Sequence, residues 1–143
     1  MIEEFMKQQH RDCDTHFAKT EELVDSKDWD NANISFLAFK NETLEHFNNE
    51  ESILFPKFEE ITGNSEGPTK IMKMEHIQIR DLIDKLELAL SNKEVIDYLS
   101  ISEATMILLQ QHNMKEEQML YPMCDNAIPE NITSSLIELM TNK

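Results

Sequence analysis

Apolar residues recur at intervals of three or four along most of the chain, which is the spacing of one face of an α-helix. In residues 2–26 this stripe runs through Met6, His10, Cys13, Phe17 and Val24. Similar stripes predict three more long helices, over about 31–61, from Pro68 or Thr69 to about Leu90, and over about 95–124.

The inner faces of the later helices are less sharply defined. The second helix has many apolar residues, and those assigned to its apolar positions include Ile34, Leu37 and Phe39. The fourth is expected to present Met119 on its inner side. Pro56 lies inside the second helix, and a proline there kinks the helix or ends its regular part.

The breaks between the stripes are short, so successive helices are expected to be antiparallel neighbours. Asp30 is the expected cap of the second helix, the loop around Gly63 and Gly67 separates the two halves, and Pro129 precedes a short C-terminal helix over about 130–141. We therefore predict an all-α fold, an up-down-up-down four-helix bundle with a short C-terminal helix, in a single domain over residues 1–143.

Composition supports a helical domain and narrows its partners. The chain has only 2 Gly and 4 Pro among 143 residues, whereas helix-forming residues are abundant. Its formal net charge of −15 opposes binding to nucleic acid or to an anionic membrane, because both select basic patches. The apolar runs are too short for a membrane span, and the acidic N-terminus does not resemble a signal peptide. We expect a cytoplasmic protein with no nucleic-acid or membrane partner.

One stretch of the sequence occurs twice. Residues 46–56 read HFNNEESILFP and residues 112–122 read HNMKEEQMLYP. Both have His, three residues, Glu-Glu, two residues, Leu, an aromatic residue and Pro, and they lie 66 positions apart. The same offset relates His10 to His76. The chain therefore divides into two pseudo-repeats, over about 5–61 and 69–125.

The repeat defines a set of candidate metal ligands, namely His10, His46, Glu50, His76, His112 and Glu116. His10 and His46 each lie about 23 Å from the turn that joins their helices, at ~1.5 Å per residue, so they have similar heights in the bundle. The same count holds in the second repeat. Within each HxxxE pair the two side chains are four residues apart and share a helix face.

Burying these groups together is costly unless something compensates. A buried carboxylate with imidazoles costs several kcal/mol without a cation or partner, and two facing carboxylates repel each other. A pair of divalent metal ions resolves both problems, and helical bundles are known to hold such pairs. Imidazole and carboxylate ligands suit iron, manganese or zinc.

The order H…HxxxE…H…HxxxE, with EESILFP and EEQMLYP around the glutamates, resembles that of the hemerythrin-like (HHE cation-binding) domains over about residues 5–125. The resemblance implies that the six candidate residues bind a non-haem di-iron centre, two Fe ions with Glu50 and Glu116 bridging them. Manganese and zinc are the alternative metals.

The pattern departs from that of the oxygen-carrying hemerythrins, whose third helix carries HxxxH and whose fourth carries HxxxxD. Here Arg80 stands four residues after His76, and the fourth-helix carboxylate, Glu116, stands four after His112. Six rather than seven protein ligands leave more open coordination positions, which favours redox or small-molecule chemistry over simple oxygen carriage. Proteins that repair iron centres and iron-sensing hemerythrin domains are more similar in motif.

Residues beside the candidate ligands have weaker signals. Glu51 and Glu117 are expected to turn away from the centre, as outer partners of the ligands or as solvent-facing groups; an under-wound fourth helix would instead bring Glu117 inward. Arg80 is expected to pair with an acidic neighbour. Asp14, its equivalent in the first repeat, is either an accessory carboxylate or the partner of a basic side chain.

Two further side chains are assigned by their position on the helices. His16 lies about 240° around the helix from His10, so we expect it at the surface or between helices. Tyr121 occupies the place that Phe55 has in the first repeat, and both are expected to pack in the core, with a redox or hydrogen-bonding role for Tyr121 as the alternative.

Three functions are compatible with the sequence. The preferred one is a di-iron protein whose open iron positions bind or react with O2, NO or peroxide, so that the expected partner is a small diatomic ligand or peroxide. The second is a module for iron sensing, storage or donation, including the repair of iron centres, without turnover. The third is a structural bundle whose histidines bind adventitious zinc. The sequence leaves open whether the protein is an enzyme.

Overall fold

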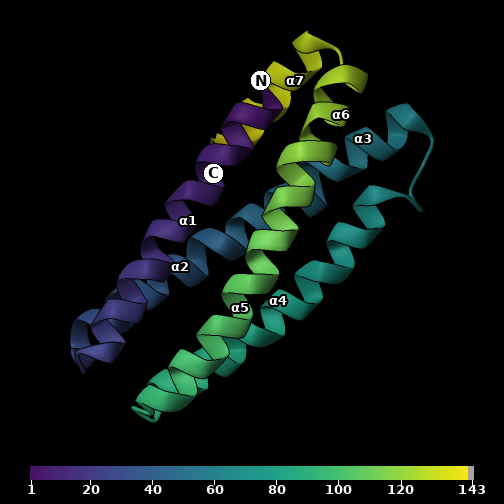
Figure 1. The fold of residues 1–143 in the computed structure, drawn as a ribbon. Helices are drawn as coiled ribbons and strands as arrows, with labels where there is room; N and C mark the ends of the chain where they lie inside the picture. Colours follow the sequence, from purple (N-terminus) through teal and green to yellow (C-terminus); the bar gives the residue numbers. More distant parts are fainter. Residues whose placement is uncertain (142–143) are drawn as a thin grey trace.

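The computed structural model describes residues 1–141, and every regular element within them is a helix (Figure 1). In chain order the elements are α1 (Ile2–Asp25), α2 (Trp29–Asn49), η1 (Glu50–Leu54), α3 (Phe55–Thr62), α4 (Pro68–Ser91), α5 (Val95–Lys115), η2 (Glu116–Leu120), α6 (Tyr121–Ala127) and α7 (Glu130–Thr141). The segments η1 and η2 are π-helical turns that join α2 to α3 and α5 to α6 without a break.

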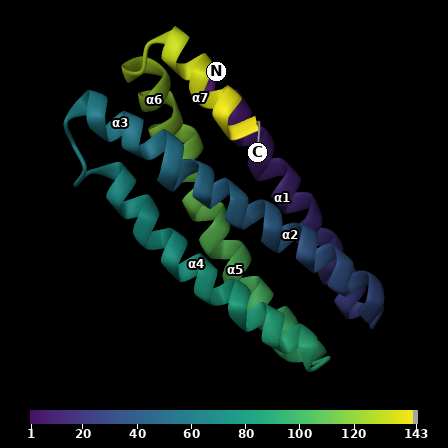
Figure 2. The same ribbon diagram turned by 180° about the vertical axis from the view of Figure 1, so that it is seen from behind.

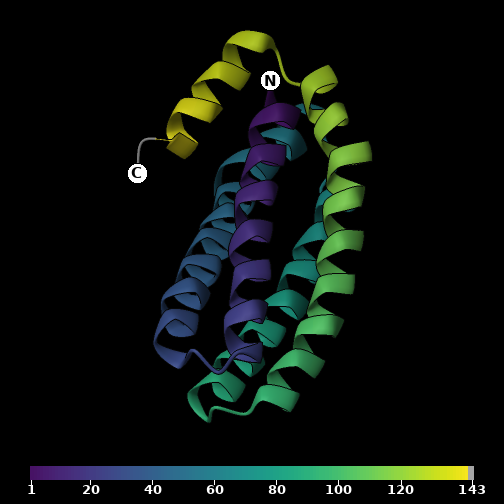
Figure 3. The same cartoon turned by 60° about the vertical axis from the view of Figure 1, so that its left-hand side comes forward.

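The long helices form the expected all-α bundle. α1 packs on α2 and α5, and α4 packs on the same two helices, so each helix has antiparallel neighbours (Figures 1 and 2). Figure 3 shows α7 folding back over the end of the bundle beside α1. No helix within residues 1–141 combines the length and apolar character that a membrane crossing requires.

The two turns at the opposite end of the bundle repeat each other. Lys27 and Lys93 both adopt positive φ angles, of 60° and 55°, just after the helices that precede them. In each turn the following residue donates its backbone N–H to a carbonyl five residues back, which is the hydrogen bond of a Schellman motif. The internal duplication therefore extends from the ligand motifs to the loops.

The cap of α2 differs from the expectation. Asp28, not Asp30, precedes the helix and accepts a hydrogen bond from the backbone N–H of Asn31. Asp30 lies in the first helical turn, where its charge complements the helix dipole. Pro56 ends the regular part of its helix, as expected: the α-helical geometry stops at Asn49, and Pro56 occupies the first turn of α3, where a missing N–H is tolerated.

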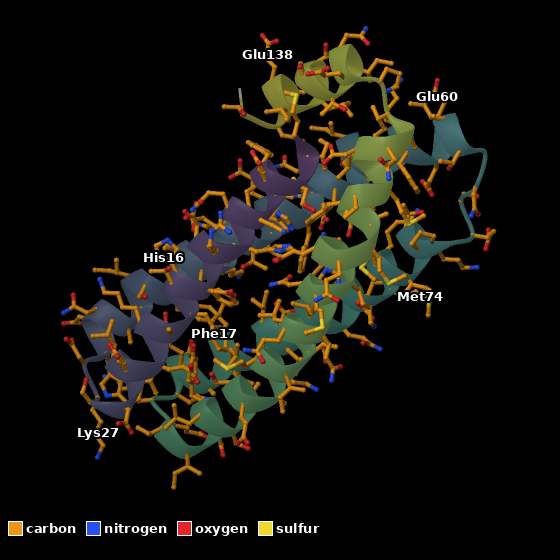
Figure 4. The ribbon with its side chains drawn as sticks, turned by 45° about the horizontal axis from the view of Figure 1, so that its top comes forward. His16, Phe17, Lys27, Glu60, Met74 and Glu138 are labelled. Carbon is orange, nitrogen blue, oxygen red and sulfur yellow. The ribbon has the colours of Figure 1, made fainter. Side chains whose placement is uncertain are left out.

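Two apolar clusters fill the bundle, one towards the α1–α2 and α4–α5 turns and the other under α7. The larger side chains of the first include Phe17, Phe36, Phe39, Phe47, Leu86 and Tyr98. Those of the second include Met6, Leu54, Phe55, Phe58, Tyr121 and Met140. In Figure 4, Phe17 lies inside the bundle and His16 on its outer side. Because α7 contributes to the second cluster, it is a packing element.

Some apolar residues do not lie where the stripes placed them. Ile34, Leu37 and Met119 are 69%, 53% and 60% exposed. α2 has more apolar residues than one face can bury, so the pattern alone did not identify the inner ones. Met119 lies in η2, whose wider turn directs Leu120 inward instead.

We predict that Phe39→Ala lowers the free energy of unfolding by about 3–5 kcal/mol, because Phe39 is buried and its removal leaves a cavity. Leu37→Ala, two residues away on the exposed face, is the matched control and should change it by less than about 0.5 kcal/mol. Urea unfolding of the two variants measures the difference, and equal losses would contradict this assignment of the inner face.

Candidate metal centre

A layer of polar side chains lies between the two apolar clusters. It contains His10 from α1, His46 from α2, Glu50 from η1, His76 from α4, His112 from α5 and Glu116 from η2. All six are at most 4% exposed. The bundle thus brings together every candidate ligand that the sequence identified.

These residues form two groups with one member in common. Donor atoms of Glu50, His76, His112 and Glu116 all lie within 4.8 Å of one another, and those of His10, His46 and Glu116 do the same. Each carboxylate also approaches one histidine of each repeat, with distances from Oε1 to Nε2 of 3.3 Å for Glu50–His46, 3.1 Å for Glu50–His76, 3.0 Å for Glu116–His10 and 3.3 Å for Glu116–His112. Each glutamate therefore faces histidines of both repeats.

Each imidazole directs Nε2 to the centre and Nδ1 to an outer oxygen. The outer contacts are His10–Glu117 at 2.7 Å, His46–Gln9 at 2.7 Å, His76–Glu51 at 2.6 Å and His112–Glu75 at 2.8 Å. An acceptor at Nδ1 fixes the tautomer that leaves the Nε2 lone pair free, and this is the usual environment of a metal-binding histidine.

These outer partners repeat as the ligands do. Glu51 and Glu117 are equivalent positions, and their outward orientation agrees with the sequence prediction. Gln9 and Glu75 are also equivalent, each preceding a histidine of the set, but the sequence analysis missed them. The signal that identifies them is the same 66-residue offset.

Four inward-facing atoms make no hydrogen bond within residues 1–141: Glu50 Oε1, His76 Nε2, His112 Nε2 and Glu116 Oε2. A buried polar atom without a partner costs about 1–3 kcal/mol. A cation between these atoms would satisfy all four at once, and the mixture of imidazole and carboxylate suits iron, manganese or zinc. The residues therefore fit a metal centre.

The comparison with known families agrees with this geometry. The sequence model described as the hemerythrin HHE cation-binding domain matches residues 1–124. The chain belongs to this family. No curated protein and no solved structure matches the chain. The family match and the buried His/Glu groups establish a hemerythrin-like cation-binding domain.

The π-helical turns of this hemerythrin-like domain follow directly on the ligand motifs. In η1 the backbone N–H of Phe55 donates to the carbonyl of Glu50, and in η2 that of Tyr121 donates to the carbonyl of Glu116. Such i to i+5 hydrogen bonds place the aromatic residue on the same side as the glutamate. The fourth helix is under-wound, but only from Glu116 onward, so Glu117 stays outside the centre.

Tyr121 packs in the second apolar cluster, as expected, and its hydroxyl also reaches the polar layer, which was the alternative. Its hydroxyl lies 2.9 Å from Glu50 Oε2 and 2.9 Å from Glu116 Oε1. Phe55 does pack in the core, with its ring parallel to that of His76 at a centroid distance of 6.1 Å. A regular α-helix turns residue i+5 away from residue i, and only the π-helical turn reverses this.

Charged residues outside the layer hold the outer partners. Arg80 pairs with Glu51 at 2.9 Å, as the sequence predicted. Asp14, its equivalent, lies instead beside Glu117 in a surface pocket, and burial raises its pKa. His16 lies between α1 and α2, where it pairs with Glu42 at 2.9 Å.

Protonation is strongly shifted in this layer. Burial and the neighbouring Glu116 carboxylate raise the pKa of Glu50 to about 8. Burial acts in the same direction on Glu116, but His112 and the surrounding hydrogen bonds outweigh it and hold the Glu116 pKa well below its usual range. Burial would lower the pKa of His112, yet Glu116 raises it to about 9. The metal-free domain therefore retains protons in place of cations.

We predict that the metal-free domain loses stability as the pH rises above about 4.5, and more steeply above about 6.5, where His112 adds to the effect of Glu50. The folded-state pKa values of Glu50 and His112, about 8 and about 9, exceed their ordinary values of 4.5 and 6.5. Stability from these protons is complete below the ordinary values and is lost as the pH rises through the folded-state values. Thermal unfolding at a series of pH values measures this loss.

Glu50→Gln tests the origin of that pH dependence. The amide keeps the shape of the side chain but cannot ionise, so the fall in melting temperature with pH should become shallower. Glu60→Gln, at a side chain that is 70% exposed, is the control and should behave as the wild type. A Glu50→Gln variant with the slope of the wild type would show that this carboxyl is not the protonated group.

We predict that Glu75→Ala weakens metal binding by about 10–100-fold, because His112 loses the acceptor that orients its ring. Glu75→Gln should lose less, since Gln9 serves the same purpose for His46. Glu66→Ala, at a side chain that is 73% exposed, is the control. Competition with a chelator measures the affinities, and equal affinities in Glu75→Ala and the control would refute this role of Glu75.

Proposed function

We propose that this hemerythrin-like domain holds a non-haem di-iron centre and binds or reacts with a small ligand such as O2, NO or peroxide. The observation that supports this most strongly is the pair of buried carboxylates, each of which approaches a histidine of both repeats. His10 and His46 would hold one ion, His76 and His112 the other, and Glu50 and Glu116 would be shared.

Bound iron would supply redox chemistry and coordination positions for the small ligand. The chain's own residues set the access and the polarity around these positions. Arg80 stands where oxygen-carrying hemerythrins have a further histidine, and it pairs with Glu51 outside the centre. The six candidate residues therefore leave part of the coordination to ligands from solution.

One surface pocket has a candidate ligand, His46, in its wall. The pocket, of about 180 Å³, is lined by Gln9, Cys13, His46 and Asn49 among others, and it reaches the edge of the polar layer at His46. A water molecule in liquid occupies about 30 Å³, so the pocket has room for a few small molecules. The buried layer behind it is closed by the two apolar clusters.

The experiment that tests the proposal is metal analysis with visible spectroscopy on protein loaded with Fe(II) without oxygen and then exposed to air. We predict two irons per chain and new near-ultraviolet or visible absorption on oxidation. His46→Ala and Glu116→Ala should each lower the iron content by about one ion or more. His16→Ala is the matched control, because His16 is the one histidine outside the layer.

The outcomes separate the candidate functions. A rapid optical change on adding O2, NO or peroxide to the ferrous protein supports the proposal. Reversible iron loss with a large fall in melting temperature and no such reaction would favour iron sensing, storage or donation, because a ligand that binds only the folded state stabilises it. Unchanged metal content in His46→Ala and Glu116→Ala would leave only adventitious binding.

A further inference from the structure

The two halves of the centre differ at one pair of equivalent positions. Phe55 follows Glu50 by five residues and Tyr121 follows Glu116 by five, and both π-helical turns direct the aromatic ring inward. The phenol oxygen of Tyr121 is therefore the one inward-facing donor of the layer that has no counterpart in the other repeat. Both aromatic residues are fully buried.

The Tyr121 hydroxyl lies on the side of His10 and His46. It is 3.1 Å from His10 Nε2 and 3.3 Å from His46 Nε2, in addition to its 2.9 Å contacts with both glutamates. The other pair of histidines faces apolar rings instead. Phe47 stacks on His76 at a centroid distance of 3.9 Å, and the ring of Phe55 lies parallel to that of His76 at 6.1 Å. The phenol thus belongs to one half of the centre.

The spacing of these atoms is that of donors around a single ion. Metal–nitrogen and metal–oxygen bonds of about 2.1 Å place neighbouring donors at right angles about 3 Å apart. His10 Nε2 and His46 Nε2 are 3.1 Å apart, and Glu116 Oε1 is 3.0 Å from the first. His46 Nε2 and Glu116 Oε1 are 3.8 Å apart, and the Tyr121 oxygen lies 2.9–3.3 Å from all three atoms. The hydroxyl is therefore close enough to these donors to share an ion with them.

We propose that Tyr121 is a ligand of the ion held by His10 and His46, which binds it as a phenolate. The proposal rests on the proposed di-iron function and adds a seventh protein donor to the six that the sequence identified. Coordination breaks the phenol O–H bond, forms a metal–oxygen bond and releases the proton to solvent, with no change in oxidation state. A bound cation favours this deprotonation, as it does for other coordinated acids.

The consequence is a centre with two unlike positions. The ion beside His10 and His46 would have an anionic oxygen donor that stabilises the ferric state. The ion beside His76 and His112 would lack this donor and would retain the more open coordination for a small ligand. Among the side chains that face the centre, this asymmetry of donors arises from one residue, because the glutamates and histidines of the two repeats correspond.

Tyr121→Phe tests the assignment. The variant introduces the residue that the first repeat already has in the same π-helical turn, so the fold should accept it. Tyr98→Phe is the matched control: Tyr98 is also fully buried, but it lies in the cluster around Phe36 and Ile83. Each protein is loaded with Fe(II) without oxygen, oxidised in air and analysed for iron content, visible absorption and resonance Raman scattering.

The wild type and Tyr98→Phe are expected to bind two irons and to show a visible phenolate-to-iron band with tyrosinate ring vibrations in the Raman spectrum. Tyr121→Phe should lose the band and these vibrations. It should also bind one of its two irons about 10–100-fold more weakly, because loss of a ligand should weaken binding at least as much as loss of a residue that only orients a ligand.

Two irons in the wild type without tyrosinate vibrations, or the same band in Tyr121→Phe, would overturn the ligand assignment and leave the di-iron proposal standing. A wild-type protein that binds no iron would overturn both. The Raman signal reports on the bond itself, so it does not depend on any reaction of the loaded protein.

Discussion

The burial of two carboxylates against each other in the middle of a helical bundle is the constraint on which the structure depends. Glu50 and Glu116 are both fully buried, and four imidazoles surround them. Two such charges repel and are poorly solvated, so the folded chain must supply protons, hydrogen-bond donors or cations. The outer acceptors at each Nδ1 keep the imidazoles oriented while the inner atoms stay unsatisfied. Such a layer is suited to binding cations, in agreement with the family to which the chain belongs.

The apolar clusters on either side of the layer make this arrangement possible. They fix all four long helices above and below the polar groups, so the side chains cannot turn away to relieve the repulsion. α7 and the aromatic residues around Phe58 close one side, and Phe39 and its neighbours close the other. Burial of these apolar side chains offsets the free-energy cost of burying the polar layer. Metal binding would remove part of that cost and so stabilise the folded state.

Duplication accounts for most of the centre, and the departures from it identify what distinguishes the two halves. The histidines, glutamates, π-helical turns and connecting loops all repeat at the same offset. Three equivalent pairs differ in chemistry: Gln9 and Glu75, Asp14 and Arg80, and Phe55 and Tyr121. These differences change the charge around one histidine, the partner of one outer glutamate and the donors on one side of the centre. The surroundings of the two pairs of histidines therefore differ, although the histidines and glutamates themselves repeat.

The sequence by itself determined the helical class, the bundle and the six candidate ligands. Helical periodicity and the 66-residue offset are properties of spacing along the chain, and they fix which residues share a face before any tertiary contact forms. Only the tertiary structure decided the inner face of α2, the roles of Gln9 and Glu75, and the inward direction of Tyr121. Each of these depends on which helix lies opposite or on where a helix under-winds. A regular repeat of 3.6 residues predicts neither the helix that lies opposite nor the place of a π-helical turn, because both are departures from, or additions to, the local spacing.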